Sequence, residues 1–239
     1  MIPTVLYKFK PLESEVDYEY IKDIIENFRL YAPNRSQVND PFEGLSVDVR
    51  LGIAGFNYCL DYGVLHPVVI DLFDRYRYVS FSGEARNPIL WAYYASNYSG
   101  VCFEFSTVHA FKNACKVEYN DHPSKVFDEQ ALDIEGFEIL KKALLVKSSC
   151  WKYEKEWRLF AEEHSPYVYF NNEDIMSVII GPNFDREKYS PLLQLAEEKG
   201  ILLRKAQPIC PKRQIEFLPV NYLFPFDDQP YTEAKFTDI

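Results

Sequence analysis

Residues 151–160 read WKYEKEWRLF, and this stretch has the clearest strand pattern in the chain. Successive side chains of a β-strand point to opposite faces of the sheet. The apolar and charged positions therefore lie on opposite faces, with Trp151, Tyr153, Trp157 and Leu159 on one and Lys152, Glu154, Glu156 and Arg158 on the other. Side chains two residues apart on one face are separated by roughly 6.5–7 Å. The pattern thus predicts two neighbouring carboxylates flanked by two cations.

This charged face has two interpretations. In a cleft, repulsion between the glutamates would raise the pKa of one of them, while Lys152 and Arg158 would lower the pKa of both. The two tryptophans on the inward face would then hold the backbone rigid and aim the glutamates. The alternative is a solvent-exposed face of alternating charge, which is common in proteins.

Shorter patterns predict the elements around this stretch. Strands are expected at 5–9, 77–82, 101–105, 116–119, 175–180 and 201–203, and helices at 21–28, 87–95, 128–147 and 190–200. Strands and helices intermix without a regular β-α-β rhythm. This favours an α+β fold, with a mixed, mostly antiparallel twisted sheet and flanking helices, over a doubly wound fold. No linker is apparent, so residues 1–239 are expected to form a single domain with a Pro-containing tail at 219–239.

Composition excludes several classes of protein. The chain has 239 residues with 26 basic and 36 acidic side chains, a net charge of −10, which disfavours a broadly basic nucleic-acid surface. The only closely spaced pair among its nine glycines is Gly52 and Gly55, so the glycine motifs of phosphate-binding loops and dinucleotide folds are absent. Five widely spaced cysteines without a CxxC motif indicate neither a disulfide scaffold nor a structural zinc site. No apolar run approaches the ~20 residues of a membrane span, so no membrane partner and a cytoplasmic location are expected.

Residues 39–43, Asn-Asp-Pro-Phe-Glu, have the form of a helix start. Asp40 followed by Pro41 and by Glu43 three residues later resembles a capping box with proline at the first helical position. The free N–H groups of a helix N-terminus also suit an anionic ligand. Capping alone would explain Asp40 and Glu43, but it requires neither Asn39 nor Phe42.

Residues 80–82, Ser-Phe-Ser, place two hydroxyl groups on one side of an expected strand. Trp91 and Tyr94 follow, about one helical turn apart. Together these side chains could form a wall that grips a ring and a ribose, although core aromatics beside a strand end would give the same pattern. Two lysines also share one face of residues 7–10, Tyr-Lys-Phe-Lys, where solvent exposure is the usual explanation.

Six blocks of the sequence resemble a bacterial family known as domain-of-unknown-function family 2971. The blocks are LYKFKPL, NDPFE, SFS, WAYYASNYSGVCFEF, WKYEKEWRLF and VIIGPNF, and the resemblance in order and spacing covers the chain from Leu6 to about Leu218. The family name brings no established activity with it.

The order of three of these blocks also looks like the layout of the ADP-ribosyltransferase superfamily. In those enzymes a first strand grips the nicotinamide ribose, a serine strand lines the pocket, and the last glutamate of a Glu-x-Glu motif is catalytic. The resemblance puts Lys8 at the first position, Ser80 and Ser82 at the second, and Glu154 and Glu156 at the third. The first position is usually Arg or His, so Lys8 departs from the pattern. The resemblance implies an ADP-ribosyltransferase-like fold, NAD as the substrate, and no metal.

The chemistry that this resemblance implies assigns a role to each residue. Glu156 would stabilise the oxocarbenium-like ribose and hold its hydroxyl groups, while Glu154 would orient the acceptor or act as its general base. Trp91 or Tyr94 would stack on nicotinamide, and Arg158 or the helix after Asp40 would meet the pyrophosphate. The expected NAD-binding set is Lys8, Asn39, Asp40, Phe42, Glu43, Ser80, Ser82, Trp91, Tyr94 and Arg158.

The leading hypothesis is therefore transfer of ADP-ribose from NAD to a macromolecular acceptor, protein or nucleic acid, as in a toxin or phage-defence effector with an inhibitory partner protein. A binding or regulatory module without catalysis is the first alternative. The second is a metal-dependent nuclease with a divalent ion on Asp40, Glu43, Glu154 and Glu156, since hard oxygens suit Mg²⁺.

Overall fold

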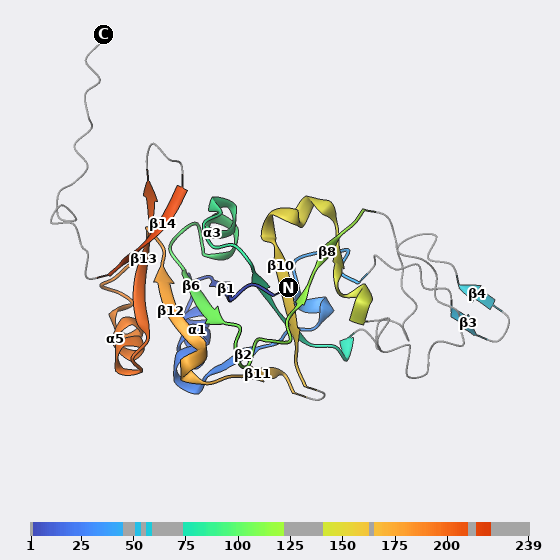
Figure 1. Cartoon of the computed structure of the whole chain (residues 1–239), viewed down its shortest axis with the longest axis horizontal. Coiled ribbons are helices and arrows are strands. Elements are labelled where there is room, and N and C mark those ends of the chain that lie inside the picture. The colour runs from blue at the N-terminus through green and yellow to red at the C-terminus, as the bar shows by residue number, and fades with distance from the viewer. Residues whose placement is uncertain are drawn as a thin grey trace, which may run out of the picture.

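An eight-stranded sheet runs through the protein (Figure 1). The computed structural model describes residues 2–44, 51–53, 56–58, 74–121, 141–162, 165–209 and 214–220. The strand order is β14-β13-β12-β6-β1-β5-β10-β7. The strands are β1 (Val5–Lys10), β5 (Tyr78–Ser82), β6 (Val101–Ser106), β7 (Cys115–Lys116), β10 (Glu156–Phe160), β12 (Ile175–Ile180), β13 (Leu202–Ile209) and β14 (Gln214–Pro219). β12 and β13 pair in parallel and the other neighbours pair antiparallel, so the expected α+β class and mixed, mostly antiparallel sheet are confirmed.

Smaller elements surround this sheet. Pairs of short strands are β2 (Arg29–Tyr31) with β11 (Tyr167–Tyr169), β3 (Leu51–Ile53) with β4 (Phe56–Tyr58), and β8 (Glu118–Tyr119) with β9 (Val146–Lys147). The helices are α1 (Glu15–Asn27), α3 (Pro88–Tyr94) and α5 (Ser190–Glu198), together with the 3-10 helices η1 (Arg35–Gln37), η3 (Ser149–Glu154) and η4 (Asn172–Asp174). Among the described residues, no helix has the length and apolar character needed to cross a membrane.

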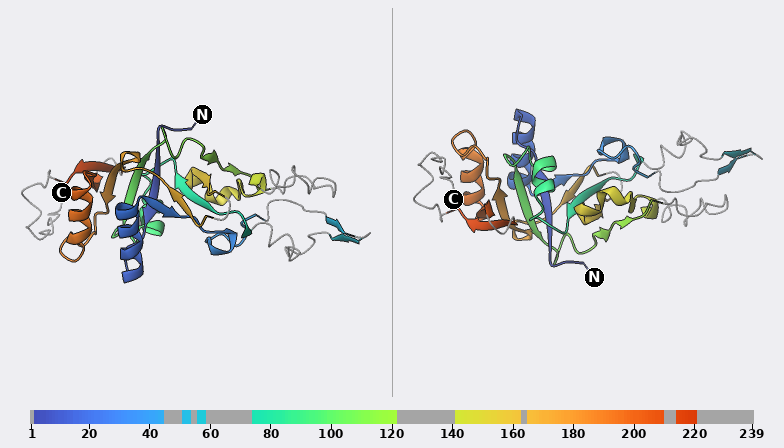
Figure 2. Two further views of the ribbon diagram at one scale, coloured as in Figure 1. Left: turned by 90° about the horizontal axis from the view of Figure 1, so that it is seen from below. Right: turned by 90° about the horizontal axis from the view of Figure 1, so that it is seen from above.

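Helices pack on both faces of the sheet. α1 and α5 lie side by side on one face (Figure 2), where Ile21 and Leu192 join a core that includes Phe103. α3 covers the opposite face, and its Trp91 meets Phe9 edge to face at 5.2 Å between ring centroids. Alternate residues of the central strands therefore supply two separate apolar cores, as the period of two in their sequence predicts.

The first helix begins where its sequence signals a cap. The Ser14 hydroxyl accepts a hydrogen bond from the Asp17 N–H at 3.2 Å, and the Asp17 carboxylate accepts one from the Ser14 N–H at 3.0 Å. This reciprocal pairing satisfies two backbone donors that the helix itself leaves free. The helix ends at Phe28, whose φ of 50° turns the chain into β2.

The central strands β1, β5 and β10 create the space for a site. β5 pairs with β10 along its whole length, with Ser82 opposite Glu156 and Ser80 opposite Arg158. In contrast, β5 meets β1 at one pair, Tyr7 opposite Ser82, while β1 stays paired with β6 from Val5 to Lys10. β1 and β5 therefore diverge beyond Tyr7, and a wedge opens between two strands of the same sheet.

The strand expected at 151–160 is confirmed in its second half and wrong in its first. Residues 149–154 form the 3-10 helix η3, and Lys155 has the left-handed angles φ 48° and ψ 48° before β10 begins. This left-handed residue breaks the period of two, so Lys152 is exposed and does not flank the glutamates. From Glu156 onward the predicted faces hold, with Trp157 and Leu159 in the α1–α5 core and Glu156 and Arg158 opposite.

The helix start expected at 39–43 is also wrong, because residues 41–44 form a turn. The Asp40 carboxylate accepts from the Phe42 N–H at 2.9 Å, as a cap would, but the Glu43 side chain binds Arg158 instead of completing a capping box. Glu43, which the local pattern assigned to a helix cap, thus forms an ion pair with Arg158 far along the chain.

Two other expectations fall partly outside the described residues. Of the helix expected at 128–147, residues 128–140 lie outside, residues 141–143 are helical, and Val146–Lys147 is strand β9 rather than a helix end. Of the tail expected at 219–239, Pro219 ends β14, which pairs with β13, and residues 221–239 lie outside. β13 itself continues to Ile209, well beyond the predicted end at 203.

Gly181 supports a tight crossing next to α3. A Cβ atom at Gly181 would lie 1.9 Å from the Tyr98 carbonyl oxygen, which belongs to backbone and has no flexible end to move aside. We expect Gly181→Ala to lower the free energy of unfolding by about 2–3 kcal/mol, measured by urea denaturation. Gly200→Ala is the matched control, since no atom lies within 4 Å of its Cβ position and its φ of +71° alone should cost about 1 kcal/mol. Equal losses in the two variants would contradict the crowding at Gly181.

Candidate active site

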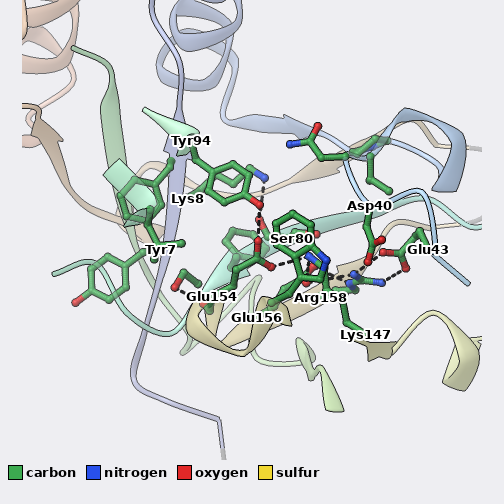
Figure 3. A pocket seen from close by; sticks show the side chains of 18 of the residues that line it. Tyr7, Lys8, Asp40, Glu43, Ser80, Tyr94, Lys147, Glu154, Glu156 and Arg158 are labelled. Carbon is green, nitrogen blue, oxygen red and sulfur yellow. Dashed lines mark hydrogen bonds and ion pairs between the residues drawn. The ribbon is translucent and has the colours of Figure 1, made fainter. Parts of the chain in front are cut away.

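A cavity of about 420 Å³ occupies the wedge between β1 and β5 (Figure 3). This volume lies within the ~300–1,000 Å³ typical of small-molecule sites. Ten of the twelve residues predicted from the sequence line it: Lys8, Asn39, Asp40, Glu43, Ser80, Ser82, Tyr94, Glu154, Glu156 and Arg158. Segments far apart in the sequence therefore converge on one space, as the hypothesis of a common site requires.

Trp91 and Phe42 do not line the cavity. Trp91 is fully buried, and its indole N–H donates to the Ala85 carbonyl at 2.7 Å, so it belongs to the core under α3. Phe42 is 67% exposed on the turn after Asp40. Of the two aromatic residues expected to stack on a ring, Tyr94 is the one whose side chain reaches the cavity.

Arg158 is the centre of a buried ion cluster. Its Nε donates to Glu156 Oε1 at 2.7 Å, and its Nη2 donates to Glu43 Oε2 at 2.9 Å and to Glu156 Oε2 at 3.2 Å. Its Nη1 donates to the Glu43 carboxylate and to the Leu144 carbonyl. These contacts engage all five N–H donors of the guanidinium. Arg158 therefore has no donor left for a pyrophosphate in this arrangement, which does not favour the role expected for it in phosphate binding.

Lys147 is the site residue that sequence reasoning missed. Its Nζ lies 2.6 Å from Glu154 Oε2 and 3.1 Å from Glu156 Oε2, and 4.7 Å from the centre of the Trp151 ring. It takes the place that the strand pattern had given to Lys152. No local motif marks Lys147, but a buried pair of glutamates requires a cation to offset desolvation, and that requirement is the signal that could have prompted a search for it.

The cluster moves the pKa values of the two glutamates in opposite directions. Burial alone would raise the pKa of Glu156, but the positive charges of Arg158 and Lys147 outweigh it and lower the pKa to about 2. For Glu154, burial raises the pKa, Lys147 opposes it, and the charge of Glu156 adds to it, so that the pKa is raised. Two acids with pKa values displaced in opposite directions are a common arrangement for acid–base chemistry.

Hydrogen bonds fix the two glutamates in place. The Tyr94 hydroxyl donates to Glu154 Oε1, and the Ser82 hydroxyl donates to the Glu154 carbonyl at 2.6 Å. The Glu156 N–H donates to the Tyr119 hydroxyl at 2.7 Å. Both ends of the Glu-x-Glu segment are therefore held, although only one of the two glutamates lies on a strand.

The acids of the cluster are already bound to cations. Glu43, Glu154 and Glu156 each contact Lys147 or Arg158 at ion-pair distance. Over the ranges that the structure describes, no group of three His, Cys, Asp or Glu side chains is placed to hold a metal ion. The described residues therefore give the nuclease alternative no ligand group that would speak for it.

Comparison with known proteins gives one match. Residues 90–159 match the family model described as Protein of unknown function (DUF2971). The matched segment contains Tyr94, Glu154, Glu156 and Arg158, so it carries much of the cavity wall. No curated protein and no solved structure matches the chain.

The structure predicts that Arg158 is critical for stability. Removing one partner of a buried ion pair leaves uncompensated charge, so Arg158→Met should lower the free energy of unfolding by about 3–5 kcal/mol. Lys155→Met is the control, because Lys155 pairs with Glu84 at 2.9 Å while 60% of its own side chain is exposed. Exposed pairs contribute about 0–1 kcal/mol. Urea unfolding of both variants measures the contrast, and a loss below that of Lys155→Met would contradict the buried cluster.

The lowered pKa of Glu156 predicts a pH dependence. Its ordinary value is 4.5 and its folded value about 2, so the folded state gains stability above pH 4.5 that is lost as the pH falls toward 2. The full effect is about 3 kcal/mol. In urea unfolding at several pH values, the stability difference between wild type and Glu156→Gln should therefore shrink from pH 5 downward. A constant difference for Glu156→Gln across this range would refute the assignment.

Proposed function

We propose that this protein binds NAD in the cavity between β1 and β5 and transfers ADP-ribose to a macromolecular acceptor. The observation that carries the proposal is the register of the three central strands. Glu156 lies opposite Ser82, and Ser82 lies opposite Tyr7, at the point where the wedge opens. The first-strand, serine and Glu-x-Glu segments expected for an ADP-ribosyltransferase are thus adjacent strands around one cavity.

Glu156 is the residue for the bond-breaking step. Cleavage of the bond between nicotinamide and ribose sends the bonding electron pair to nicotinamide and leaves positive charge on the ribose C1 atom. A carboxylate held ionised beside that carbon stabilises the transition state more than the ground state. Burial would raise the pKa of Glu156, but the positive charges of Arg158 and Lys147 outweigh that effect and lower the pKa to about 2. Glu156 therefore carries its negative charge at every physiological pH.

Glu154 suits the transfer step. The acceptor nucleophile forms a bond to the same ribose carbon and releases a proton, which needs a base in reach. The raised pKa of Glu154, which follows from burial more than from the neighbouring charge of Glu156, makes its carboxylate a better proton acceptor. Lys147 contacts both glutamates and Tyr94 donates to Glu154, so the carboxylate is held in one orientation.

Aromatic side chains offer a surface for the nicotinamide ring. Tyr94 and Trp151 both line the cavity on the side of Glu154, and stacking on such rings is favourable for a planar heterocycle. Tyr94 therefore takes the stacking role that the sequence had left open between it and Trp91. The acceptor as protein or nucleic acid, and a setting in toxicity or phage defence, rest on the family resemblance.

The test is incubation of the protein with labelled NAD and a cell extract. We expect nicotinamide release and label transfer by the wild type, a loss of more than a hundredfold in nicotinamide release for Glu156→Gln, and retained NAD hydrolysis with reduced transfer for Glu154→Gln. Glu173→Gln, with a side chain that is 70% exposed, should behave as the wild type. Absence of both nicotinamide release and label transfer in folded wild-type protein would refute the proposal.

A further inference from the structure

The cations of the cavity fall into two groups. Lys147 and Arg158 are neutralised by Glu43, Glu154 and Glu156. Lys8 and Lys10, on the last part of β1, also line the cavity. In the part of the chain that the structure describes, no ion pair joins either of these two lysines to a carboxylate. The β1 side of the cavity therefore carries two ammonium groups that no described carboxylate contacts at ion-pair distance, although Asp17 acts on Lys10 and the two glutamates act on Lys8 from farther away.

Both lysines lie where β1 has separated from β5. Lys8 Nζ spans the wedge and donates to the Ser80 carbonyl at 2.8 Å, which uses one of its three N–H donors. Lys10 Nζ lies 5.8 Å from the centre of the Tyr20 ring. Lys8 and Lys10 are two positions apart on β1, so their side chains lie on the same face of the strand and leave it about 6.5–7 Å apart.

Keeping Lys8 and Lys10 charged in these buried surroundings costs free energy when no anion is bound. Burial lowers the pKa of Lys8 to about 7; the positive charge of Lys10 adds to this lowering, and the charges of Glu156 and Glu154 oppose it. Burial likewise lowers the pKa of Lys10, against an opposing effect of Asp17. A dianionic group between the two ammonium groups would relieve both the desolvation and the mutual repulsion.

We infer that Lys8 and Lys10 form a phosphate-binding subsite that holds the diphosphate of the nucleotide. The assignment of the diphosphate to NAD rests on the proposed function, whereas the affinity for phosphate groups rests only on the charges and geometry of β1. In NAD the diphosphate is attached to the nicotinamide ribose. A diphosphate on Lys8 and Lys10 would therefore place the ribose between β1 and the ionised Glu156, with the ring toward Tyr94 and Trp151.

The experiment measures binding of inorganic pyrophosphate and of ADP by isothermal titration calorimetry at fixed pH and ionic strength. We expect both to bind the wild type, and Lys10→Met and Lys8→Met each to weaken binding about tenfold or more. Lys10→Arg should stay within about threefold of the wild type, because it keeps the charge. Lys112→Met is the matched control at an exposed lysine far along the chain, and it should bind as the wild type does. Unfolding curves confirm that each variant is folded.

Each outcome separates this inference from the proposed function. Pyrophosphate binding that depends on Lys8 and Lys10 in a protein that never releases nicotinamide would support the subsite and refute the transferase. Nicotinamide release with a KM for NAD that neither lysine variant changes would refute the subsite and leave the transferase intact. Wild-type protein that binds neither pyrophosphate nor ADP at millimolar concentration would also refute the subsite, as would equal weakening in Lys112→Met.

Discussion

The buried ion cluster around Arg158 is the interaction on which the site depends. Removing a single charge from water costs desolvation free energy, and this cost is offset only when partners lie at hydrogen-bond distance. Arg158 meets that condition by binding Glu43, which is 115 positions away in the chain, together with Glu156 on its own strand. The cluster therefore holds the turn at 41–44, the segment before β9 and strand β10 to one another, and these segments form one wall of the cavity.

The composition of the cluster also explains the difference between the two glutamates. Three carboxylates face two cations at ion-pair distance, so the cluster carries an excess negative charge when all three carboxylates are ionised. Glu43 and Glu156 each share the guanidinium of Arg158, whereas Glu154 relies on Lys147 and on the Tyr94 hydroxyl. Glu154 is thus the acid for which protonation is least costly, which agrees with a pKa raised by burial and by the charge of Glu156.

Most patterns within a single segment were predictable from the sequence, whereas the ion pairs between segments were not. Strands such as β6 and β12 follow from alternating or continuous apolar residues that face two cores, and the cap of α1 follows from Ser14 and Asp17. The 3-10 helix before Glu156 was not predicted because its last four residues, Trp151 to Glu154, alternate apolar and polar side chains as a strand does. The role of Lys147 and the pairing of Glu43 with Arg158 were not predicted, because they depend on which charges the fold brings together.

A lysine rather than an arginine at the eighth position is consistent with the geometry of the wedge. The Arg158 guanidinium shows what an arginine does when buried here, since every one of its donors is committed to fixed partners. The ammonium of Lys8 instead gives one donor to the Ser80 carbonyl across the gap between β1 and β5, and its other two donors have no hydrogen-bond partner among the described residues. A compact charge on a flexible stem can bind a phosphate group without the planar, two-point geometry that a guanidinium prefers.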